Sequence, residues 1–358
     1  MFQKKALWLC NLLLAVTLAL MLPACSKKNH QSSASSGQAT PVGNSPKEAR
    51  HPLKVALLCS GSFTDGGWNE EGRDAMLRLK RRLHLKVSML EHVSPVRAGN
   101  IMRQYIARGY NLVIGHGYEF LDPASQVAPT SRRTHFAIDG ADKIQPNVAT
   151  LNFDLSQPSY QLGVLAAMLS KTGRLGFIGG EAIPSVVACY TGFLAGARSV
   201  NPHITVAHAY TSWDQPALSK SQAEAFIQQH IDVIYQNVDA ASRGVFEAVA
   251  AADRHLPPGG HPVYVFGSNT DQNYNSTCGA YTPASAVIRL DRAYKKLILE
   301  IIHGHFRPGV HQENSANGVC VTVLNPRLIG TVITPAMQRA VKRAGAQLQS
   351  GKIVISAG

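Results

Sequence analysis

The sequence contains none of the short motifs that mark the common catalytic sites. There is no G-x-S-x-G nucleophile elbow, no P-loop and no H-E-x-x-H zinc motif. The segment "GHGYEF" (115–120) begins like a dinucleotide-binding fingerprint, but Phe120 stands in place of its third glycine. Carboxylates occur at predicted strand ends, yet no nucleophile is placed beside them. These absences argue against an enzyme, and we expect no cofactor.

The sequence also lacks C-x-x-C pairs, the usual spacing of cysteine ligands in structural zinc sites. His303, His305 and His311 lie close together in "HGHFRPGVH", but the glycine and proline between them indicate a turn. We therefore expect no metal site.

Six cysteines are present, and the redox state of the compartment determines whether they form disulfides. An oxidising compartment would allow three full pairings among the four that follow the N-terminal segment, and the sequence does not choose between them. Cys59, in the apolar run "VALLC", can equally be a buried small hydrophobe. The four are Cys59, Cys189, Cys278 and Cys320.

Basic residues exceed acidic ones, with 35 Lys and Arg against 22 Asp and Glu and a net charge of +13. The basic residues are scattered, and their densest run, "RLKRR" (78–82), falls within one predicted helix. No nucleic-acid-binding motif accompanies them. We therefore expect no nucleic-acid partner and interpret the charge as a solvated basic face near anionic lipid or polymer.

The N-terminus has the layout of an exported protein. Lys4 and Lys5 precede an apolar stretch that ends in "LPAC" (22–25), which resembles the lipobox of bacterial lipoproteins. A membrane-spanning anchor is the alternative. We expect residues 1–24 to be a signal peptide and Cys25 to carry the lipid. Residues 25–50, rich in Ser, Gly and Pro, are expected to form a flexible tether at the periplasmic side of the cell envelope.

After the tether, apolar strand patterns alternate with helical patterns in two successive series. The first series runs from "LKVALLCS" (53–60) to "NVATLNF" (147–153), and the second from "RLGFIGG" (174–180) to "PVYVFGSN" (262–269). Repeated strand–helix–strand units predict an α/β protein with two doubly wound lobes. Right-handed crossovers place the loops after the strands on one edge of each sheet, where a cleft would form between the lobes.

The loop "SGSFTDGGWNEEG" (60–72) lies at such a strand end and leads into a helix. Gly66 and Gly67 permit close approach of the backbone. Asp65 either accepts a hydrogen bond from a ligand or caps the helix. Trp68 is either buried in its lobe or covers a ligand. Asp139 and Asp239 are further acceptors at predicted strand ends.

Segments spread along the chain resemble, in the same order, those of the basic membrane protein family. They include "SGSFTDGGWNEEG", "NLVIGHGYEF", "HFAIDG", "GRLGFIGG", "GFLAGARSVNP", "YTSWDQP", "DVIYQN", "RGVFEA" and "GSNTDQN". The family comprises lipid-anchored substrate-binding components of ABC transporters, including purine nucleoside receptors. The resemblance implies a type I periplasmic-binding-protein fold with a three-segment hinge. Residues 51–152 and 287–306 would form lobe 1, and residues 153–286 and 307–358 would form lobe 2.

The resemblance also assigns site residues. The base-stacking aromatic corresponds to Trp68, followed by Asn69, and the acidic residue of "FAID" to Asp139. The second aromatic falls on Cys189, with Tyr190 beside it. The implied ligand-binding set is Asp65, Trp68, Asn69, Tyr118, Asp139, Tyr190, Asp239 and Asn269.

Two further family positions hold different residues here. The ribose-binding aspartate corresponds to Asn269 and the ribose-binding lysine to Ile288, and "DAAS" (239–242) replaces a glycine-rich loop. The resemblance thus implies a purine base or nucleoside as ligand, with any ribose held differently from the usual way.

The expected partners are the ligand, an ABC permease with its ATPase, and the membrane through the lipid anchor. We expect a monomer. The alternatives are a ligand-sensing envelope receptor without a transport role, an enzyme of the cell envelope, and a structural envelope lipoprotein.

Overall fold

The computed structural model describes residues 52–355. These residues belong to one compact unit that spans residues 51–358. The predicted signal peptide, the lipidated Cys25 and the tether lie outside the described residues. Within the described part, no helix is both long and apolar enough to cross a membrane.

The first sheet has six strands in the order β11-β5-β4-β3-β1-β2, and all neighbouring strands are parallel. The chain order reverses beside β1, so the loops after β1 and β3 lie at the topological switch point, where open α/β sheets bind ligands. The strands are β1 (Lys54–Cys59), β2 (Lys86–Leu90), β3 (Leu112–His116), β4 (His135–Asp139), β5 (Val148–Phe153) and β11 (Gly309–Glu313).

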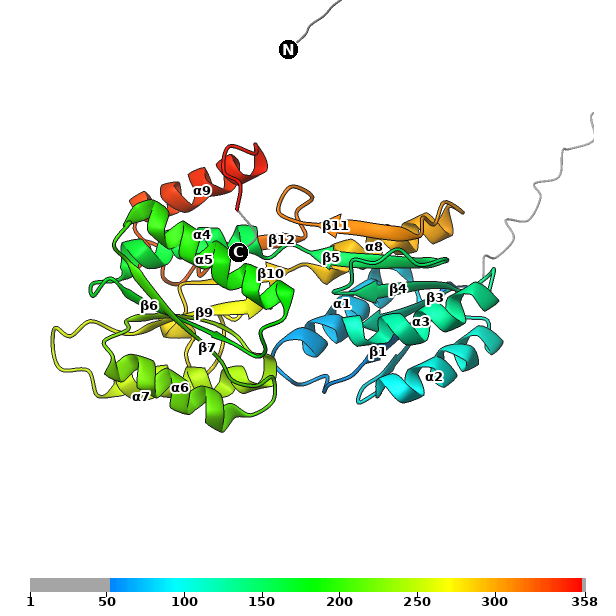
Figure 1. Ribbon diagram of the computed structural model, residues 1–358, viewed down its shortest axis with the longest axis horizontal. Helices are drawn as coiled ribbons and strands as arrows, with labels where there is room; N and C mark the ends of the chain where they lie inside the picture. Colours follow the sequence, from blue (N-terminus) through cyan, green and yellow to red (C-terminus); the bar gives the residue numbers. More distant parts are fainter. Residues whose placement is uncertain (1–51, 356–358) are drawn as a thin grey trace, which may run out of the picture. The chain divides into compact units, whose positions relative to one another are not determined.

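Helices cover both faces of this sheet (Figure 1). Val55, Leu57 and Cys59 of β1 belong to the core beneath α1 and α8, whereas Ala56 and Leu58 belong to the core beneath α2 and α3. This alternation is the period of two expected of a strand buried on both faces. The helices are α1 (Trp68–Leu83), α2 (Pro95–Ala107), α3 (Leu121–Val127) and α8 (Leu290–Ile302). We call this sheet with its helices the first lobe.

The second sheet repeats the arrangement in the order β12-β10-β9-β8-β6-β7. Its strands are parallel except β12, which runs antiparallel to β10. Its switch point lies between β6 and β8. The strands are β6 (Arg174–Gly179), β7 (Thr205–Tyr210), β8 (Val233–Asn237), β9 (Tyr264–Asn269), β10 (Ala284–Ile288) and β12 (Cys320–Leu324).

The second lobe consists of this sheet and its helices. Leu175 and Phe177 of β6 contribute to one core, and Ile178 contributes to the core beneath α6 and α7. In Figure 1, α4, α5 and α9 lie on one side of the sheet and α6 and α7 on the other. The helices are α4 (Ser156–Leu169), α5 (Pro184–Val200), α6 (Pro216–Gln228), α7 (Ser242–Arg254) and α9 (Pro335–Gln349).

The chain passes between the lobes three times: after β5, after β10 and after β11. One strand lies in a different lobe from the one expected from the sequence. Residues 307–358 were expected in lobe 2, but β11 pairs with β5 in the first sheet, from Gly309 beside Ala149 to Glu313 beside Phe153. The pairing adds a sixth strand to the first sheet and satisfies backbone groups at the edge of β5.

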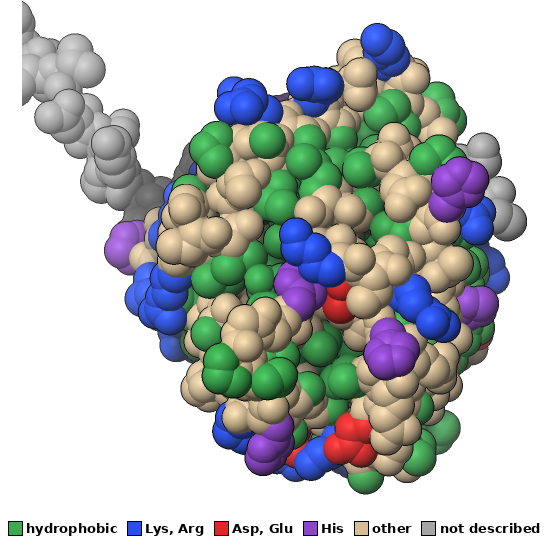
Figure 2. Space-filling view, turned by 90° about the vertical axis from the view of Figure 1, so that its left-hand side faces the viewer, with side chains coloured by type: hydrophobic (Ala, Val, Ile, Leu, Met, Phe, Trp, Pro, Cys, Tyr) green, Lys and Arg blue, Asp and Glu red, His purple; other side chains and the backbone are tan. Residues whose placement is uncertain are grey.

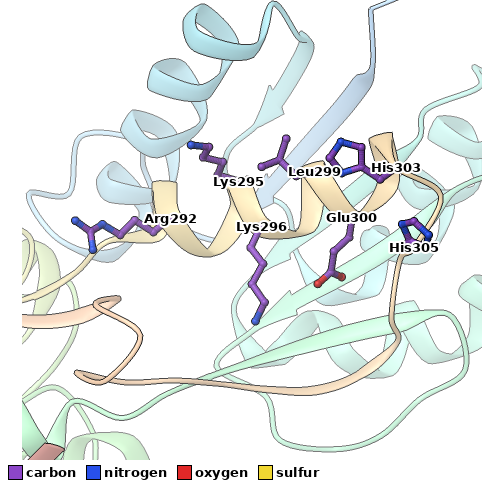
Figure 3. A pocket seen from close by; sticks show the side chains of 7 residues that line it. All are labelled: Arg292, Lys295, Lys296, Leu299, Glu300, His303 and His305. Carbon is purple, nitrogen blue, oxygen red and sulfur yellow. The ribbon is translucent and has the colours of Figure 1, made fainter. Parts of the chain in front are cut away.

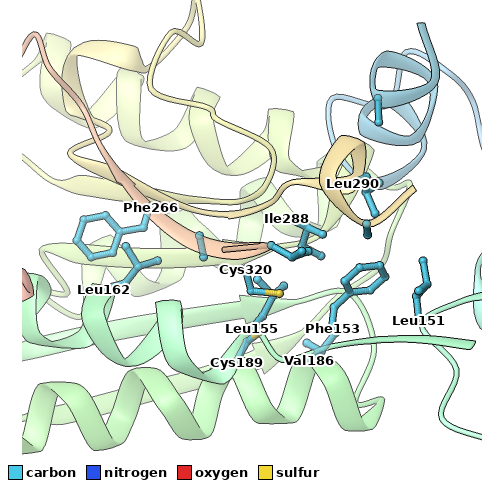
Figure 4. Packing of buried hydrophobic residues seen from close by; sticks show 14 of the residues in the cluster. Leu151, Phe153, Leu155, Leu162, Val186, Cys189, Phe266, Ile288, Leu290 and Cys320 are labelled. Atoms are coloured by element: carbon cyan, nitrogen blue, oxygen red, sulfur yellow. The ribbon is translucent and has the colours of Figure 1, made fainter. Parts of the chain in front are cut away.

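The hydrophobic core is continuous across these crossings. Phe153, Leu155, Ile288 and Leu290 lie in the crossing segments and belong to one cluster with core residues of both lobes (Figure 4). Two short helices follow β3 that were not predicted from the sequence: a 3-10 turn at Tyr118–Phe120 and α3. Segments this short carry a weak periodic pattern.

Candidate functional site

The loop after β1 uses its carboxylate to begin a helix. Asp65 accepts hydrogen bonds from the backbone N–H groups of Gly67, Asn69 and Glu70 at 2.9–3.0 Å, and from the Asn69 amide at 2.8 Å. These contacts satisfy N–H groups that the first turn of a helix leaves without partners. Of the two roles considered for Asp65, the geometry supports capping of α1.

Trp68, the first residue of α1, lies between two other rings. Its indole stacks on the imidazole of His116, with ring centroids 4.1 Å apart and planes 11° apart. Phe153 meets the indole edge-on, at 5.9 Å and 76°. The Trp68 carbonyl oxygen accepts a hydrogen bond from His116 Nε2 at 2.8 Å. Trp68 remains partly exposed, so it is neither a simple core residue nor a free surface ring.

Below Trp68 lies a buried polar group of three side chains. His116 Nδ1 lies 2.5 Å from Asp139 Oδ2 and 2.9 Å from the Tyr294 hydroxyl, which also donates to Asp139 Oδ2. All three side chains are fully buried. Burial acts to lower the pKa of His116, but the hydrogen bond and charge of Asp139, with the Trp68 carbonyl, outweigh it and raise that pKa.

Polar contacts join the two lobes at the beginning of α1. The Trp68 N–H donates to Asp239 Oδ1 at 3.1 Å, and the Asn269 amide donates to the same oxygen at 3.1 Å. Gln272 donates to the Gly66 carbonyl at 3.0 Å. A side chain at Gly67 would lie 2.6 Å from Asp239 Oδ1, so the approach of the lobes requires glycine there. The described conformation is therefore one in which the lobes are in contact.

Asp239 is the titratable group of this contact. Burial, together with the negative charge of Asp65, raises its pKa to about 7. The Trp68 N–H, the Asn269 amide and the charge of His116 act in the opposite direction but do not compensate. Asp239 also has a φ of 43°, a left-handed conformation that residues other than glycine seldom adopt.

The structure brings together five of the predicted site residues: Asp65, Trp68, Asn69, Asp239 and Asn269. Asp139 reaches them only through His116.

Tyr118 is 58% exposed at the start of its 3-10 turn, with no described contact to this group. Tyr190, on α5, lies beside Phe177 and His208 within the second lobe. Asn69 is buried and accepts the Gly61 N–H at 3.3 Å, so its amide serves the loop itself.

Two of the positions that depart from the family pattern belong to the hydrophobic core. Ile288 and Cys189 are buried in the cluster that crosses between the lobes. The four cysteines of the described part are all buried and unpaired, and burial raises the pKa of each thiol. The structure thus contains none of the three possible pairings within residues 52–355.

Three residues of this site were not predicted from the sequence: His116, Gln272 and Tyr294. His116 ends β3, and the rule that identified Asp139 at the end of β4 could have identified it. Tyr294 lies on α8, 155 residues from Asp139 in the sequence, and no local pattern connects the two.

Two cavities of the described part lie away from this contact. One, of about 500 Å³, is a groove along α8 (Figure 3). Its polar lining consists of Glu300 and five basic side chains, those of Arg292, Lys295, Lys296, His303 and His305. The other, of about 310 Å³, lies between the start of α4 and residues 348–355.

In residues 52–355, no group of three or more His, Cys, Asp or Glu side chains is arranged to hold a metal ion. On the second-lobe face, Lys and Arg are spread rather than gathered (Figure 2).

Comparison with known proteins connects this arrangement to a family. A purine-binding protein of Brucella abortus (strain 2308) is 31% identical over 198 residues, which are 54% of this chain and 57% of the relative. The chain thus spans little more than half the length of that protein. The nucleoside-binding protein BmpA of an ABC transporter of Lactococcus lactis is 27% identical over 267 residues, 73% of each chain.

Solved structures share the two-lobed fold. A solute-binding protein of an ABC transporter system from Aeropyrum pernix K1 superposes with a TM-score of 0.75 at 20% identity, covering 86% of this chain and 94% of that one. One from Conexibacter woesei DSM 14684 has a TM-score of 0.71 at 25% identity, covering 85% and 99%. The predicted periplasmic-binding-protein fold is confirmed.

A family model described as ABC transporter substrate-binding protein PnrA-like matches residues 53–317, well over half of the sequence. This match agrees with the two-lobed fold and with the polar contact that the loop after β1 makes with the loop after β8. Members of the family bind solutes and are not enzymes. The chain belongs to the PnrA-like family of ABC transporter substrate-binding proteins.

Proposed function

We propose that this protein is a lipid-anchored, periplasmic substrate-binding protein that holds a purine base or nucleoside between its lobes for uptake. The observation that carries the proposal is the position of Trp68. Its indole is partly exposed at the contact between the lobes, and its own backbone N–H binds Asp239 of the opposite lobe. The names of the Brucella and Lactococcus relatives support a purine or nucleoside ligand.

A purine has apolar faces and a polar edge, and this site offers groups for both. Burying the ring requires an aromatic surface for its face and fixed acceptors for the N–H groups at its edge. Trp68 supplies the surface from the first lobe, and Asp239 supplies an acceptor from the second. To admit a ligand, the direct contacts between Trp68 and Asp239 and between Gly66 and Gln272 must give way.

The residues at the ribose positions predict a small preference for a nucleoside over its base, or none. A carboxylate and a lysine would hold vicinal hydroxyls by charge-assisted hydrogen bonds. Asn269 provides an amide that is already bonded to Asp239, and Ile288 provides an apolar surface that is 2% exposed. The ribose would therefore add little to the affinity.

The anchor and the transport partners complete the proposal. Cys25 is the acylation site that would hold the protein at the membrane, and replacement of Cys25 by Ala should release it from the membrane fraction. The partners would be an ABC permease and its ATPase, with the binding protein as a monomer. A sensory role without transport is the alternative, and permease and ATPase genes beside the gene for this protein would distinguish transport from it.

Calorimetry with adenine, guanine, hypoxanthine and their nucleosides tests the ligand. Base–aromatic stacking contributes about 1–3 kcal/mol per base, so Trp68→Ala should weaken binding about 10- to 100-fold. Phe306→Ala is the matched control, since Phe306 is a partly buried aromatic of the first lobe that stacks on His135 outside the site. Absence of purine binding, or equal affinity in Trp68→Ala, would show that the proposed site is wrong.

A further inference from the structure

The family pattern assigns Asp139 to the ligand, but the structure gives it a different neighbour. Its Oδ2 atom bonds His116 and Tyr294, and the residue has no solvent exposure. Between Asp139 and the contact of the lobes lies His116, whose ring is covered in turn by Trp68. Asp139 therefore acts on the site through His116.

The hydrogen bonds of His116 define its protonation. Nε2 faces the Trp68 carbonyl oxygen, which can only accept, so Nε2 carries a proton. Nδ1 faces Asp139 Oδ2, which also accepts the Tyr294 hydroxyl. The hydrogen bond and charge of Asp139 raise the pKa of His116, so Nδ1 carries the second proton. The ring is an imidazolium paired with a buried carboxylate.

Two contacts connect this imidazolium to Trp68. The rings lie nearly parallel at 4.1 Å, a geometry that combines stacking with attraction between a cation and the π face. The Nε2–H bond to the carbonyl oxygen holds the backbone of the same residue. One side chain thus fixes both the main chain and the ring of Trp68.

The sequence makes room for His116 at Gly72, one turn after Trp68 on α1. A Cβ atom at Gly72 would lie 2.8 Å from His116 Cδ2 and Nε2. Any other residue at that position would press on the imidazole. Glycine in a helix interior is less favourable than alanine, and the close packing of His116 explains why glycine is present there.

We propose that His116, held as an imidazolium by Asp139 and Tyr294, is a positioning residue that fixes the Trp68 indole as the stacking surface of the site between the lobes. The proposal concerns the site of the proposed function and rests on it for the ligand, while the arrangement of His116 and Trp68 is testable without ligand. A free indole would have to be ordered when the ligand binds, and ordering one side chain costs about 0.5–1.5 kcal/mol.

Fluorescence of Trp68 tests the arrangement in the ligand-free protein. The full chain has three tryptophans, so Trp8→Phe with Trp213→Phe leaves Trp68 as the only emitter. A stacked imidazolium quenches indole emission. We expect weak emission at pH 7, recovery well above pH 6.5 because the pKa of His116 is raised, and strong, pH-independent emission in His116→Gln. Equal emission with and without His116 would overturn the proposal.

Calorimetry then tests the role in binding. His116→Gln should weaken binding of a purine by about 2- to 10-fold, which is the ordering cost of one side chain. Tyr294→Phe, which keeps the ring but loses the hydroxyl bonded to Asp139 and His116, should change the pH at which emission recovers. Gly72→Ala should raise emission by displacing His116. His135→Gln is the matched control, because His135 stacks on Phe306 at 4.2 Å elsewhere in the first lobe.

The two kinds of failure are distinguishable. Quenching that depends on His116, with unchanged affinity in His116→Gln, overturns the positioning role and leaves the proposed function standing. If no purine binds the parent protein, the proposed function fails, whereas the fluorescence still shows whether His116 holds Trp68.

Discussion

Asp239 carries a charge that its surroundings do not balance. It receives two hydrogen bonds, from Trp68 and Asn269, but the charged groups facing it are Asp65, which repels it, and the distant His116. With its pKa raised from 3.8 to about 7, the carboxyl group takes up a proton when the lobes meet. Contact between the lobes is thus coupled to pH through a single residue.

Closure should weaken as the pH rises. In an open state Asp239 would face water and regain its ordinary pKa, so the closed state binds the proton more tightly between about pH 4 and pH 7. Linkage then predicts a closed-to-open ratio about tenfold lower at pH 8 than at pH 6. Small-angle scattering of the ligand-free protein should show a larger radius of gyration at pH 8.

Asp239→Asn removes the titrating group and should abolish this difference. Asp253→Asn is the matched control, since burial raises the pKa of Asp253 to about 6 within the second lobe, where it accepts the Val263 N–H. A pH-dependent radius that persists in Asp239→Asn would assign the effect to another group.

Among the helices, α1 has an N-terminus that receives hydrogen bonds from carboxylates of both lobes. Asp65 of its own loop binds the N–H groups of Asn69 and Glu70 in the first turn and that of Gly67 just before it, and Asp239 of the other lobe binds that of Trp68. The partial positive charge of a helix N-terminus favours both carboxylates. The helix therefore keeps its start when the lobes separate, because the contacts from Asp65 stay within the first lobe.

Asp65→Ala should destabilise the protein by about 1–2 kcal/mol, the usual cost of losing a helix cap. Urea unfolding followed by circular dichroism measures this change in the free energy of unfolding. Asp65→Asn keeps an acceptor oxygen and should lose less. Equal stability of Asp65→Ala and the parent would contradict the capping role and restore Asp65 as a candidate ligand contact.

At the scale of the whole described unit, the two lobes share one apolar core through the crossing segments and few polar contacts at the cleft. Phe153, Ile288 and Leu290 hold the crossings together, whereas Gln272 reaches over the cleft to the Gly66 carbonyl. Apolar packing at the hinge persists during rotation of the lobes, while the polar contacts at the cleft can exchange with water or ligand.

Removal of the Gln272 amide should favour opening. Gln272→Ala loses the bond to Gly66 and the one that Gln272 accepts from Gln236 at 2.6 Å. We expect a larger radius of gyration in the ligand-free variant and compaction when a purine is added. Gln161→Ala is the control, because Gln161 bonds Val341 and Thr322 within the second lobe. A ligand that binds tightly without compaction would contradict hinge closure.

Local sequence patterns predicted the alternation of strands and helices, the two lobes and the loop that presents Trp68. These features depend on local periodicity and on glycine placement, which neighbouring residues display. The strand-end rule led to Asp139 and Asp239. The two βαβ series predicted the two-lobed fold, and the resemblance of ordered segments along the chain implied the family.

The roles of those residues depend on contacts that form only when the chain folds. Asp139 meets Tyr294 of α8, and Asp239 meets Trp68 across 171 residues, so no local pattern could show that one is buried beneath the site and the other lies at the cleft. The same holds for β11, whose pairing with β5 joins segments about 160 residues apart. Contacts over such separations are set by packing of the whole chain, because they exist only once the distant segments that supply them have come together.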